Sequence, residues 1–268
     1  MRRLVAGLAL VVAGATLAGC GSDSAESFSL AAGTSVVDSG FIRELVSEYQ
    51  VDHPDVEISV IGLSSAEAFA YARAYTVEAI ITHDRVGLRE YQDHDANAVS
   101  SVPFESSFVL VGPSTSSVRA PGTEFSSIVD AFGFIALSGQ EFVSRDDGSG
   151  TNVRELEIWS EVPADPTAEE WYTRTGAGMG STLQVADQRD AWILAELGTF
   201  LTAEPVLGIS VQSLGSNEML DNPYDLTVVG LHKGPALAFA RWLSSEDGAA
   251  AIGRANDRLF GKPVYVVP

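Results

Sequence analysis

The sequence predicts an α/β protein with largely parallel strand pairing. Short apolar runs alternate with amphipathic helical patterns, and loops rich in glycine, serine, threonine or aspartate join strand to helix. This strand–loop–helix order is typical of parallel sheets, because parallel strands need a crossover connection. The chain has 268 residues, with no internal repeat and no long low-complexity segment. It is long enough to form two lobes.

The first residues have the pattern of an export signal. The basic pair Arg2-Arg3 precedes an uncharged apolar run that ends in Leu17-Ala18-Gly19-Cys20, a lipobox. The run is shorter than the roughly 20 residues that a membrane-spanning helix needs. We therefore expect a lipoprotein signal peptide at residues 1–19, a lipidated Cys20 and a polar tether at residues 20–27.

Charge and cysteine content exclude several classes of function. Cys20 is the only cysteine, so no internal disulfide is expected. The formal net charge of −20 excludes nucleic-acid binding, which needs a basic face, and disfavours docking on anionic lipid. A lipid on Cys20 would then be the membrane tether of an extracytoplasmic protein. An anion site in this chain would need dense local donors, because the general field is negative.

The first part of the chain alternates strand and helix patterns. An apolar strand at 28–31 is followed by apolar residues from Ile42 to Tyr49 at helical spacing. Val56 to Ile61 alternates as a strand, residues 64–75 form a helical pattern, and Val77 to Ile81 is a buried strand. His83 follows this strand, but a single histidine at a strand end is more often structural than ligand-binding.

The rest of the chain continues the same order. Pro235 suits the first position of a helix, because its fixed φ angle is helical and its missing N–H is not needed there. The expected elements are a strand at 104–111, a helix at 126–137, a strand ending at Val143, a helix at 152–159, an extended run at 170–182, a helix from Leu183, a strand and helix start at 192–200, strands at 206–211 and 226–229, helices from Pro235 and at 244–252, and a terminal strand at 264–267.

The loop around Arg145 is a candidate oxyanion site. Gly148 and Gly150 let the backbone approach a ligand closely, and Ser149 and Thr151 can cap the following helix or donate hydroxyls. The first turn of a helix leaves N–H groups without partners at its positive end. Arg145 adds a cationic fork suited to oxygen anions. The competing interpretation is an ordinary helix entry with a surface arginine.

Two further strand-to-helix loops have the same character. Thr34 and Ser35 follow the first strand, and Ser181 and Thr182 follow a glycine-rich run. In open α/β sheets, ligands bind outside the carboxyl ends of the strands, so these loops are expected to converge. A site made only of N–H, hydroxyl and arginine donors would select a deprotonated tetrahedral dianion, which carries only acceptors.

Motifs over nearly the whole mature chain follow the order found in one family. They are Thr34-Ser35 with Asp38-Ser39-Gly40, Phe142-Val143-Ser144-Arg145, Ser149-Gly150-Thr151 ahead of Glu155-Leu156, Trp171-Tyr172, Gly178-Met179-Gly180 with Thr182-Leu183, Gly198-Thr199-Phe200 and Asn222-Pro223-Tyr224. As a set they resemble the extracytoplasmic tungstate-binding proteins of ABC importers, a group within the type II periplasmic binding protein fold.

The resemblance implies a two-lobed fold in which each lobe is a mostly parallel sheet flanked by helices. Lobe 1 would comprise residues 28–108 and 226–268, and lobe 2 residues 109–225, with a hinge near 106–111 and 222–229. It implies a monomeric, non-enzymatic receptor that passes tungstate or molybdate to a permease and needs no cofactor or metal. The implied anion-binding residues are Thr34, Ser35, Ser144, Arg145, Ser149, Thr151, Gly180, Ser181 and Thr182.

The sequence departs from the family at three places, which leaves alternatives open. Val36-Val37 thins a hydroxyl-rich loop, Glu196-Leu197 replaces a pair that contains arginine, and Asp146 stands in the central loop. If Asp146 faced the ligand, it would favour a protonated anion such as hydrogen phosphate. The alternatives are a phosphate-type receptor or sensor, and a serine hydrolase using Ser144 or Ser149, for which no elbow motif or partner base is evident.

Overall fold

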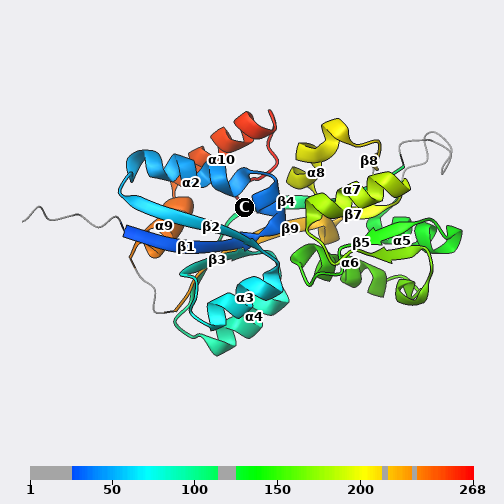
Figure 1. Ribbon diagram of the computed structural model, residues 1–268, viewed down its shortest axis with the longest axis horizontal. Coiled ribbons are helices and arrows are strands. Elements are labelled where there is room, and N and C mark those ends of the chain that lie inside the picture. Colours follow the sequence, from blue (N-terminus) through cyan, green and yellow to red (C-terminus); the bar gives the residue numbers. More distant parts are fainter. Residues whose placement is uncertain (1–25, 114–124, 213–216, 231–233) are drawn as a thin grey trace, which may run out of the picture.

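The computed structural model describes residues 26–113, 125–212, 217–230 and 234–268. The expected signal peptide and Cys20 lie outside these residues, and Glu26 and Ser27 of the expected tether belong to the first strand. Figure 1 shows an α/β structure whose elements form two groups side by side. We call them the first half and the second half.

The first half gathers elements from both ends of the described chain (Figure 1). Strand β1 pairs in parallel with β2 and with β3. Helix α2 packs on this layer because its buried residues, from Phe41 to Tyr49, recur at helical spacing, as the sequence predicts. The elements are β1 (Glu26–Gly33), α1 (Thr34–Asp38), α2 (Phe41–Asp52), β2 (Val56–Leu63), α3 (Ser65–Arg73), β3 (Ala79–Thr82), α4 (Arg85–His94), α9 (Pro235–Leu243) and α10 (Glu246–Leu259).

The second half is built from the middle of the chain. Its two short strands β5 and β6 pair in parallel, and Phe142 of β5 forms a bridge to Trp192, just before β7. The elements are α5 (Ile128–Ser138), β5 (Phe142–Ser144), α6 (Gly150–Ser160), β6 (Tyr172–Arg174), α7 (Met179–Arg189), β7 (Ile193–Glu196), α8 (Leu197–Ala203) and β8 (Ser210–Val211), with the short 3-10 helices η1 (Pro166–Ala168), η2 (Glu204–Val206) and η3 (Glu218–Leu220).

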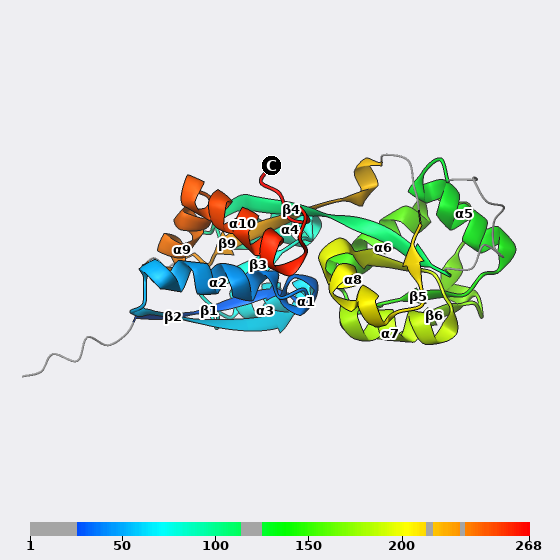
Figure 2. The same cartoon turned by 90° about the horizontal axis from the view of Figure 1, so that it is seen from above.

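Two strands, β4 (Val99–Gly112) and β9 (Asp221–Val228), run between the halves (Figure 2). The main sheet has the order β2-β1-β3-β9-β4-β7, with β8 paired to β4. Every pairing made by β4 or β9 is antiparallel. The expectation of mostly parallel sheets is therefore wrong for this sheet. The reason is that β4 leads out of the first half and β9 leads back, so both directions occur side by side.

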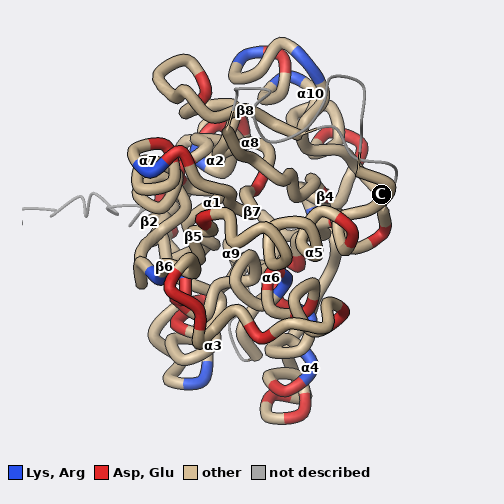
Figure 3. The backbone as a smooth tube through the Cα atoms, turned by 90° about the vertical axis from the view of Figure 1, so that its right-hand side faces the viewer, with Lys and Arg blue, Asp and Glu red and all other residues tan. Residues whose placement is uncertain are grey.

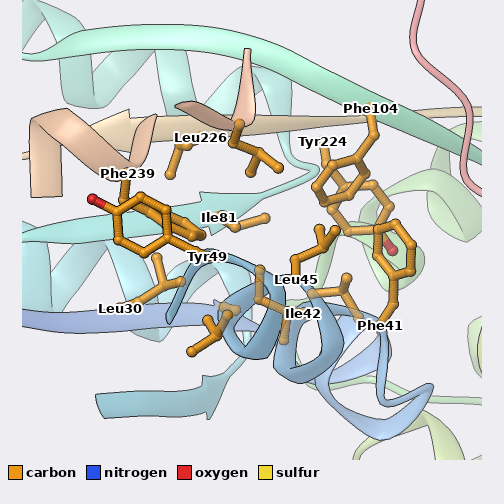
Figure 4. Packing of buried hydrophobic residues seen from close by; sticks show 14 of the residues in the cluster. Leu30, Phe41, Ile42, Leu45, Tyr49, Ile81, Phe104, Tyr224, Leu226 and Phe239 are labelled. Atoms are coloured by element: carbon orange, nitrogen blue, oxygen red, sulfur yellow. The ribbon is translucent and has the colours of Figure 1, made fainter. Parts of the chain in front are cut away.

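Each half has its own hydrophobic core. In the first half, Phe41 stacks on Tyr265 with ring centroids 3.9 Å apart and meets Phe104 edge-on at 5.2 Å. Figure 4 shows Phe41, Phe104 and Phe239 among the aliphatic residues packed between helix and sheet. In the second half, Phe132 and Trp159 pack with their ring centroids 4.5 Å apart. The two halves therefore have distinct cores, and Leu197 and Leu201 of α8 also pack against the core of the first half.

A few elements differ from the sequence prediction. Thr34 and Ser35 lie in the short helix α1 rather than in a loop. Helix α4 has no counterpart among the expected elements, because Leu88 and Tyr91 are its only buried residues and leave little apolar pattern. The strand expected at 264–267 is wrong, since that segment makes a single bridge from Val266 to β4.

The acidic surplus is spread over the molecule. Figure 3 shows Lys and Arg as short segments separated by red and tan ones, without a continuous basic face. Among the described residues, no helix is both long enough and apolar enough to cross a membrane. In the same residues, no group of three His, Cys, Asp or Glu is placed to hold a metal ion.

Replacing Phe41 with alanine is expected to destabilise the protein by about 3–5 kcal/mol, because it empties a fully buried aromatic site. Val51→Ala on the same helix is the matched control, since Val51 is 76% exposed and should change stability by less than about 0.5 kcal/mol. Urea denaturation of both variants measures the difference. Equal stabilities of the two variants would contradict the packing of Phe41 against Tyr265 and Phe104.

Candidate functional site

Three loops meet where the two halves face each other. Thr34 begins α1 after β1, Arg145 follows β5, and Gly178 precedes α7. One guanidinium nitrogen of Arg145, Nη2, donates a 2.7 Å hydrogen bond to Oγ1 of Thr34 across the junction. A side chain added at Gly178 would begin 3.9 Å from the same Oγ1 atom. The structure thus brings together the loops that the sequence singles out.

Arg145 is the most unusual residue at this junction, because its side chain is only 1% exposed. Its Nη2 atom also contacts the carboxylate of Asp147 at 2.6 Å. The other two nitrogens, Nε and Nη1, are buried and have no hydrogen-bond partner among the described residues. Buried donors without an acceptor are costly, so this arrangement is suited to an acceptor that comes from outside the chain.

The loop after Arg145 directs its two carboxylates to opposite sides. Asp146 has a φ angle of 47° and is exposed, 3.9 Å from Arg174 on the outer surface. Asp147 turns inward, where one oxygen contacts Arg145 and the other accepts the Ser149 N–H at 3.1 Å. The acceptor that faces the junction is therefore Asp147. The sequence had suggested Asp146 for that position, but Asp146 lies on the outer surface.

Helix α6 begins directly against the first half. Ser149 caps the helix by accepting the Asn152 N–H at 3.3 Å. A side chain added at Gly150 would lie 2.5 Å from the imidazole of His83, so only glycine allows this close approach. The hydroxyl of Thr151 is buried without a partner among the described residues. Thr151, in the first turn of α6, thus keeps a free donor, and the Ser149 hydroxyl accepts a hydrogen bond as the helix cap but can still donate its own proton.

Ser144 points into the second half. Its hydroxyl donates to Glu155 at 2.8 Å, and the hydroxyl of Tyr172 donates to the other carboxylate oxygen at 2.5 Å. Burial raises the pKa of Glu155 to about 7, although both hydrogen bonds act to lower it. In this conformation, the Ser144 hydroxyl anchors its loop to Glu155 of α6 and does not present a donor at the junction.

Two of the predicted donors at the start of α7 are already hydrogen-bonded within the protein. The Thr182 hydroxyl donates to the Gly178 carbonyl at 2.9 Å, so it stabilises the helix entry. Ser181 is exposed. The N–H of Gly180 is hydrogen-bonded to the carboxylate of Asp38, which comes from the first half. Asp38 is exposed as a residue, but its carboxylate is partly removed from water, and this desolvation raises its pKa. The hydrogen bond from Gly180 and the positive charge of Arg145 act in the opposite direction.

A chain of buried polar groups underlies the junction on the first-half side. The Ser35 hydroxyl lies 3.3 Å from the hydroxyl of Tyr224, which also accepts from the Asn222 side chain at 3.3 Å. The Nδ1 atom of His83 lies 2.8 Å from the Asn222 side-chain oxygen, and its ring stacks on Tyr224. Burial lowers the pKa of His83 to about 4, so the imidazole is neutral at neutral pH.

Glu196 fixes the second half to a crossing strand. Its buried carboxylate accepts the Ser106 hydroxyl of β4 at 2.9 Å and the Gly198 and Thr199 N–H groups at the start of α8. Thr199 in turn donates to the Ser35 carbonyl in the first half at 2.9 Å. Burial raises the pKa of Glu196 against these hydrogen bonds.

Several residues at the junction are not among the predicted anion-binding residues. They are Asp38, His83, Asp147, Glu196, Thr199, Asn222 and Tyr224. His83 directly follows β3 and Glu196 is the last residue of β7, so the rule that ligands bind at the carboxyl ends of strands was the available signal for them. Asn222 and Tyr224 lie on the crossing strand β9 and belong to one of the motifs that carry the family resemblance, but no hydrophobic pattern assigns them to the junction.

An opening lined by residues of both halves lies beside α4 and α6 and has a volume of about 170 Å³. Its charged lining residues are Asp84, Arg85, Arg89, Arg154, Glu157 and Asp221. Three positive and three negative side chains balance each other there. The opening therefore lacks the excess of donors that distinguishes the surroundings of Arg145.

The geometry fits binding better than catalysis. Ser144 is fully buried against Glu155, and Ser149 is occupied as a helix cap, so neither is placed as a nucleophile. An α/β protein whose halves meet across buried, unpaired donors has the features of a binding protein of the periplasmic type. The chain belongs to the PBP superfamily, whose domain matches residues 21–247.

Comparison with individual proteins agrees with this family. The chain is 33% identical over 243 residues to a Haloferax volcanii protein provisionally named as an ABC transporter anion-binding protein, covering 87% of this chain and 70% of that one. It is 28% identical over 242 residues to the tungstate-binding protein TupA of Peptoclostridium acidaminophilum, covering 88% of this chain and 84% of that protein. The structure of the tungstate ABC transporter from Geobacter sulfurreducens matches with a TM-score of 0.73 at 26% identity, covering 85% of this chain and 98% of that chain. The resemblance seen in the sequence is confirmed.

Glu155 should make stability depend on pH in a definite direction. Its ordinary pKa is 4.5 and its folded pKa is about 7, so between these values the folded state holds a proton that the unfolded state has lost. This group therefore lowers the free energy of unfolding as pH rises through that window, by about 3 kcal/mol at most, and adds no further slope above it.

Glu155→Gln is expected to remove this part of the pH dependence. The control is Glu157→Gln on the same helix, whose side chain is 44% exposed and should leave the slope unchanged. Chemical denaturation at several pH values between 4.5 and 7 measures both variants. If Glu155→Gln and the wild type had the same slope, the assignment of Glu155 would be wrong.

Proposed function

We propose that this chain is the substrate-binding protein of an ABC importer and that it captures a tetrahedral oxyanion between its two halves. The observation that carries the proposal is the buried guanidinium of Arg145, which keeps two donors without partners at the junction. The relatives named as anion-binding and tungstate-binding proteins support the same class of ligand.

Tungstate is the proposed ion, with molybdate as its close chemical counterpart. Both are tetrahedral dianions without a proton at neutral pH, so they carry only acceptors, which match the unpaired donors of Arg145 and Thr151. The proposed ligands are Thr34, Ser35, Ser144, Arg145, Ser149, Thr151, Gly180, Ser181 and Thr182. Arg145 and Thr151 have free donors now. The Ser144 hydroxyl would have to leave Glu155, whereas the Ser149 hydroxyl accepts the Asn152 N–H and could donate to the anion at the same time.

The two halves would act as lobes that close on the anion. The proposed lobes are residues 28–108 with 226–268, and residues 109–225, joined by the strands β4 and β9. The present contacts from Arg145 to Thr34 and from Gly150 to His83 hold the lobes together, so entry of an ion would require them to separate. Closure would then exclude water and strengthen charge-assisted hydrogen bonds.

The proposed location is the outer face of the cell membrane or the periplasm. A lipid on Cys20 would hold the protein near its permease, to which the closed form would deliver the ion, and the protein would act as a monomer. A phosphate receptor or a sensor is the alternative that Asp147 favours, because a carboxylate facing the junction can accept a hydrogen bond from a protonated anion.

Arg145→Ala is expected to weaken tungstate binding by about 100-fold or more, since it removes the buried cation of the site. Arg174→Ala is the matched control, because Arg174 belongs to the outer surface beside the same loop and should bind normally. Calorimetric titration of the purified protein with tungstate, molybdate, phosphate and sulfate measures each affinity. Absence of heat and of thermal stabilisation with every anion, from a folded and ligand-free sample, would disprove the proposal.

Gly150→Ala tests whether closure contributes to affinity. The added methyl group would meet the His83 ring at 2.5 Å, so the closed form should become less populated and binding about 10-fold weaker or more. Gly253→Ala is the control, since no heavy atom of the described residues lies within 4 Å of the added group. Equal affinities for Gly150→Ala and the wild type would show that the closed contact is not needed.

A further inference from the structure

Asp147 supplies a negative charge directly beside the buried guanidinium of Arg145. Its Oδ2 atom contacts Nη2 of Arg145 at 2.6 Å, and its side chain is 13% exposed. Among the described residues, it is the only carboxylate in contact with this guanidinium. Asp38 is the other carboxylate nearby, but it is hydrogen-bonded to the Gly180 N–H. The protein thus neutralises its buried cation with a group of its own.

Asp147 satisfies only part of the hydrogen-bonding capacity of the Arg145 guanidinium, so an anion could replace it. Asp147 engages only Nη2, while Nε and Nη1 stay buried without partners. Guanidinium pairs well with carboxylates or oxyanions through two parallel hydrogen bonds, and this pair uses one nitrogen. An oxyanion could satisfy the free nitrogens, but its charge would then lie close to the Asp147 carboxylate.

We infer that Asp147 is an internal competitor for the anion and sets the charge that a ligand must carry. It stabilises Arg145 when the site is empty, and it repels a bound oxyanion until it leaves Nη2. A tetrahedral dianion has enough charge to replace it, whereas a tetrahedral monoanion such as perchlorate does not. This inference rests on the proposed anion-binding function and concerns the choice of ion at the same site.

The substitution Asp147→Asn removes the competing charge and keeps the local turn. The amide oxygen of asparagine can still accept the Ser149 N–H that Asp147 now accepts at 3.1 Å. The empty site would lose a charged partner and the filled site would lose a repulsion. Both changes favour the anion. Asp147→Ser is the second variant, because its hydroxyl can also accept that N–H.

Asp146→Asn is the matched control. It removes the same charge from the neighbouring residue of the same loop, but Asp146 is exposed and lies near Arg174 on the outer surface. A general change in net charge would affect both asparagine variants equally. A competitor at the Arg145 guanidinium would affect Asp147→Asn alone.

The experiment is calorimetric titration of the wild type and the three variants with sodium tungstate and with sodium perchlorate, together with thermal unfolding with and without each salt. We expect Asp147→Asn to bind tungstate about fivefold or more tighter than the wild type and to gain measurable perchlorate binding. Its ligand-free melting temperature should fall and its rise with tungstate should exceed that of the wild type. Asp146→Asn should bind tungstate within about twofold of the wild type.

The outcomes separate this inference from the proposed function. If the wild type binds tungstate and both Asp147→Asn and Asp147→Ser bind it equally well or more weakly, the inference is overturned and the proposed function stays intact. Tungstate binding by an Asp147 variant but not by the wild type would support strong competition. No binding of any anion by any variant would overturn both. If Asp147→Asn fails to fold, Asp147→Ser decides by the same criteria.

Discussion

The positive charge of Arg145, removed from water between two halves of the chain, is the constraint on which the site depends. A buried cation is stable only when opposite charge or several acceptors surround it. The protein supplies one carboxylate, Asp147, and one hydroxyl, Thr34, and these come from different halves. Arg145 therefore links the electrostatics of the site to the contact between the halves, because any change in one changes the other.

Around this charge, the structure holds its loops with groups that are satisfied among themselves. Glu155 accepts the hydroxyls of Ser144 and Tyr172 near the Arg145 loop. Glu196 accepts the Ser106 hydroxyl of β4 and two N–H groups at the start of α8. These buried acids fix the backbone without competing for the guanidinium. Supporting groups whose own hydrogen bonds are complete keep a site rigid, and they leave its unpaired donors for a ligand.

Much of the fold follows from the sequence, because hydrophobic periodicity is set locally. The strands and helices of both halves lie close to where their apolar patterns indicate, and Arg145 follows from its place after a strand. Strand direction does not follow, since it depends on how β4 and β9 cross between the halves. Nor does the choice between Asp146 and Asp147, which a φ angle of 47° at Asp146 decides. Val36 is a related case: it departs from the family as a lost donor, yet it is a fully buried core residue.

The strand order has a consequence for synthesis at the ribosome. Strand β9 lies between β3 and β4 in the sheet, although more than a hundred residues separate it from β3 in the chain. All elements of the second half precede β9, so they leave the ribosome while the first half still lacks the middle strand of its sheet and the helices α9 and α10. The segment translated in the middle can thus fold before the one that began first, and the nascent first half must stay soluble with an open sheet edge until translation is almost complete.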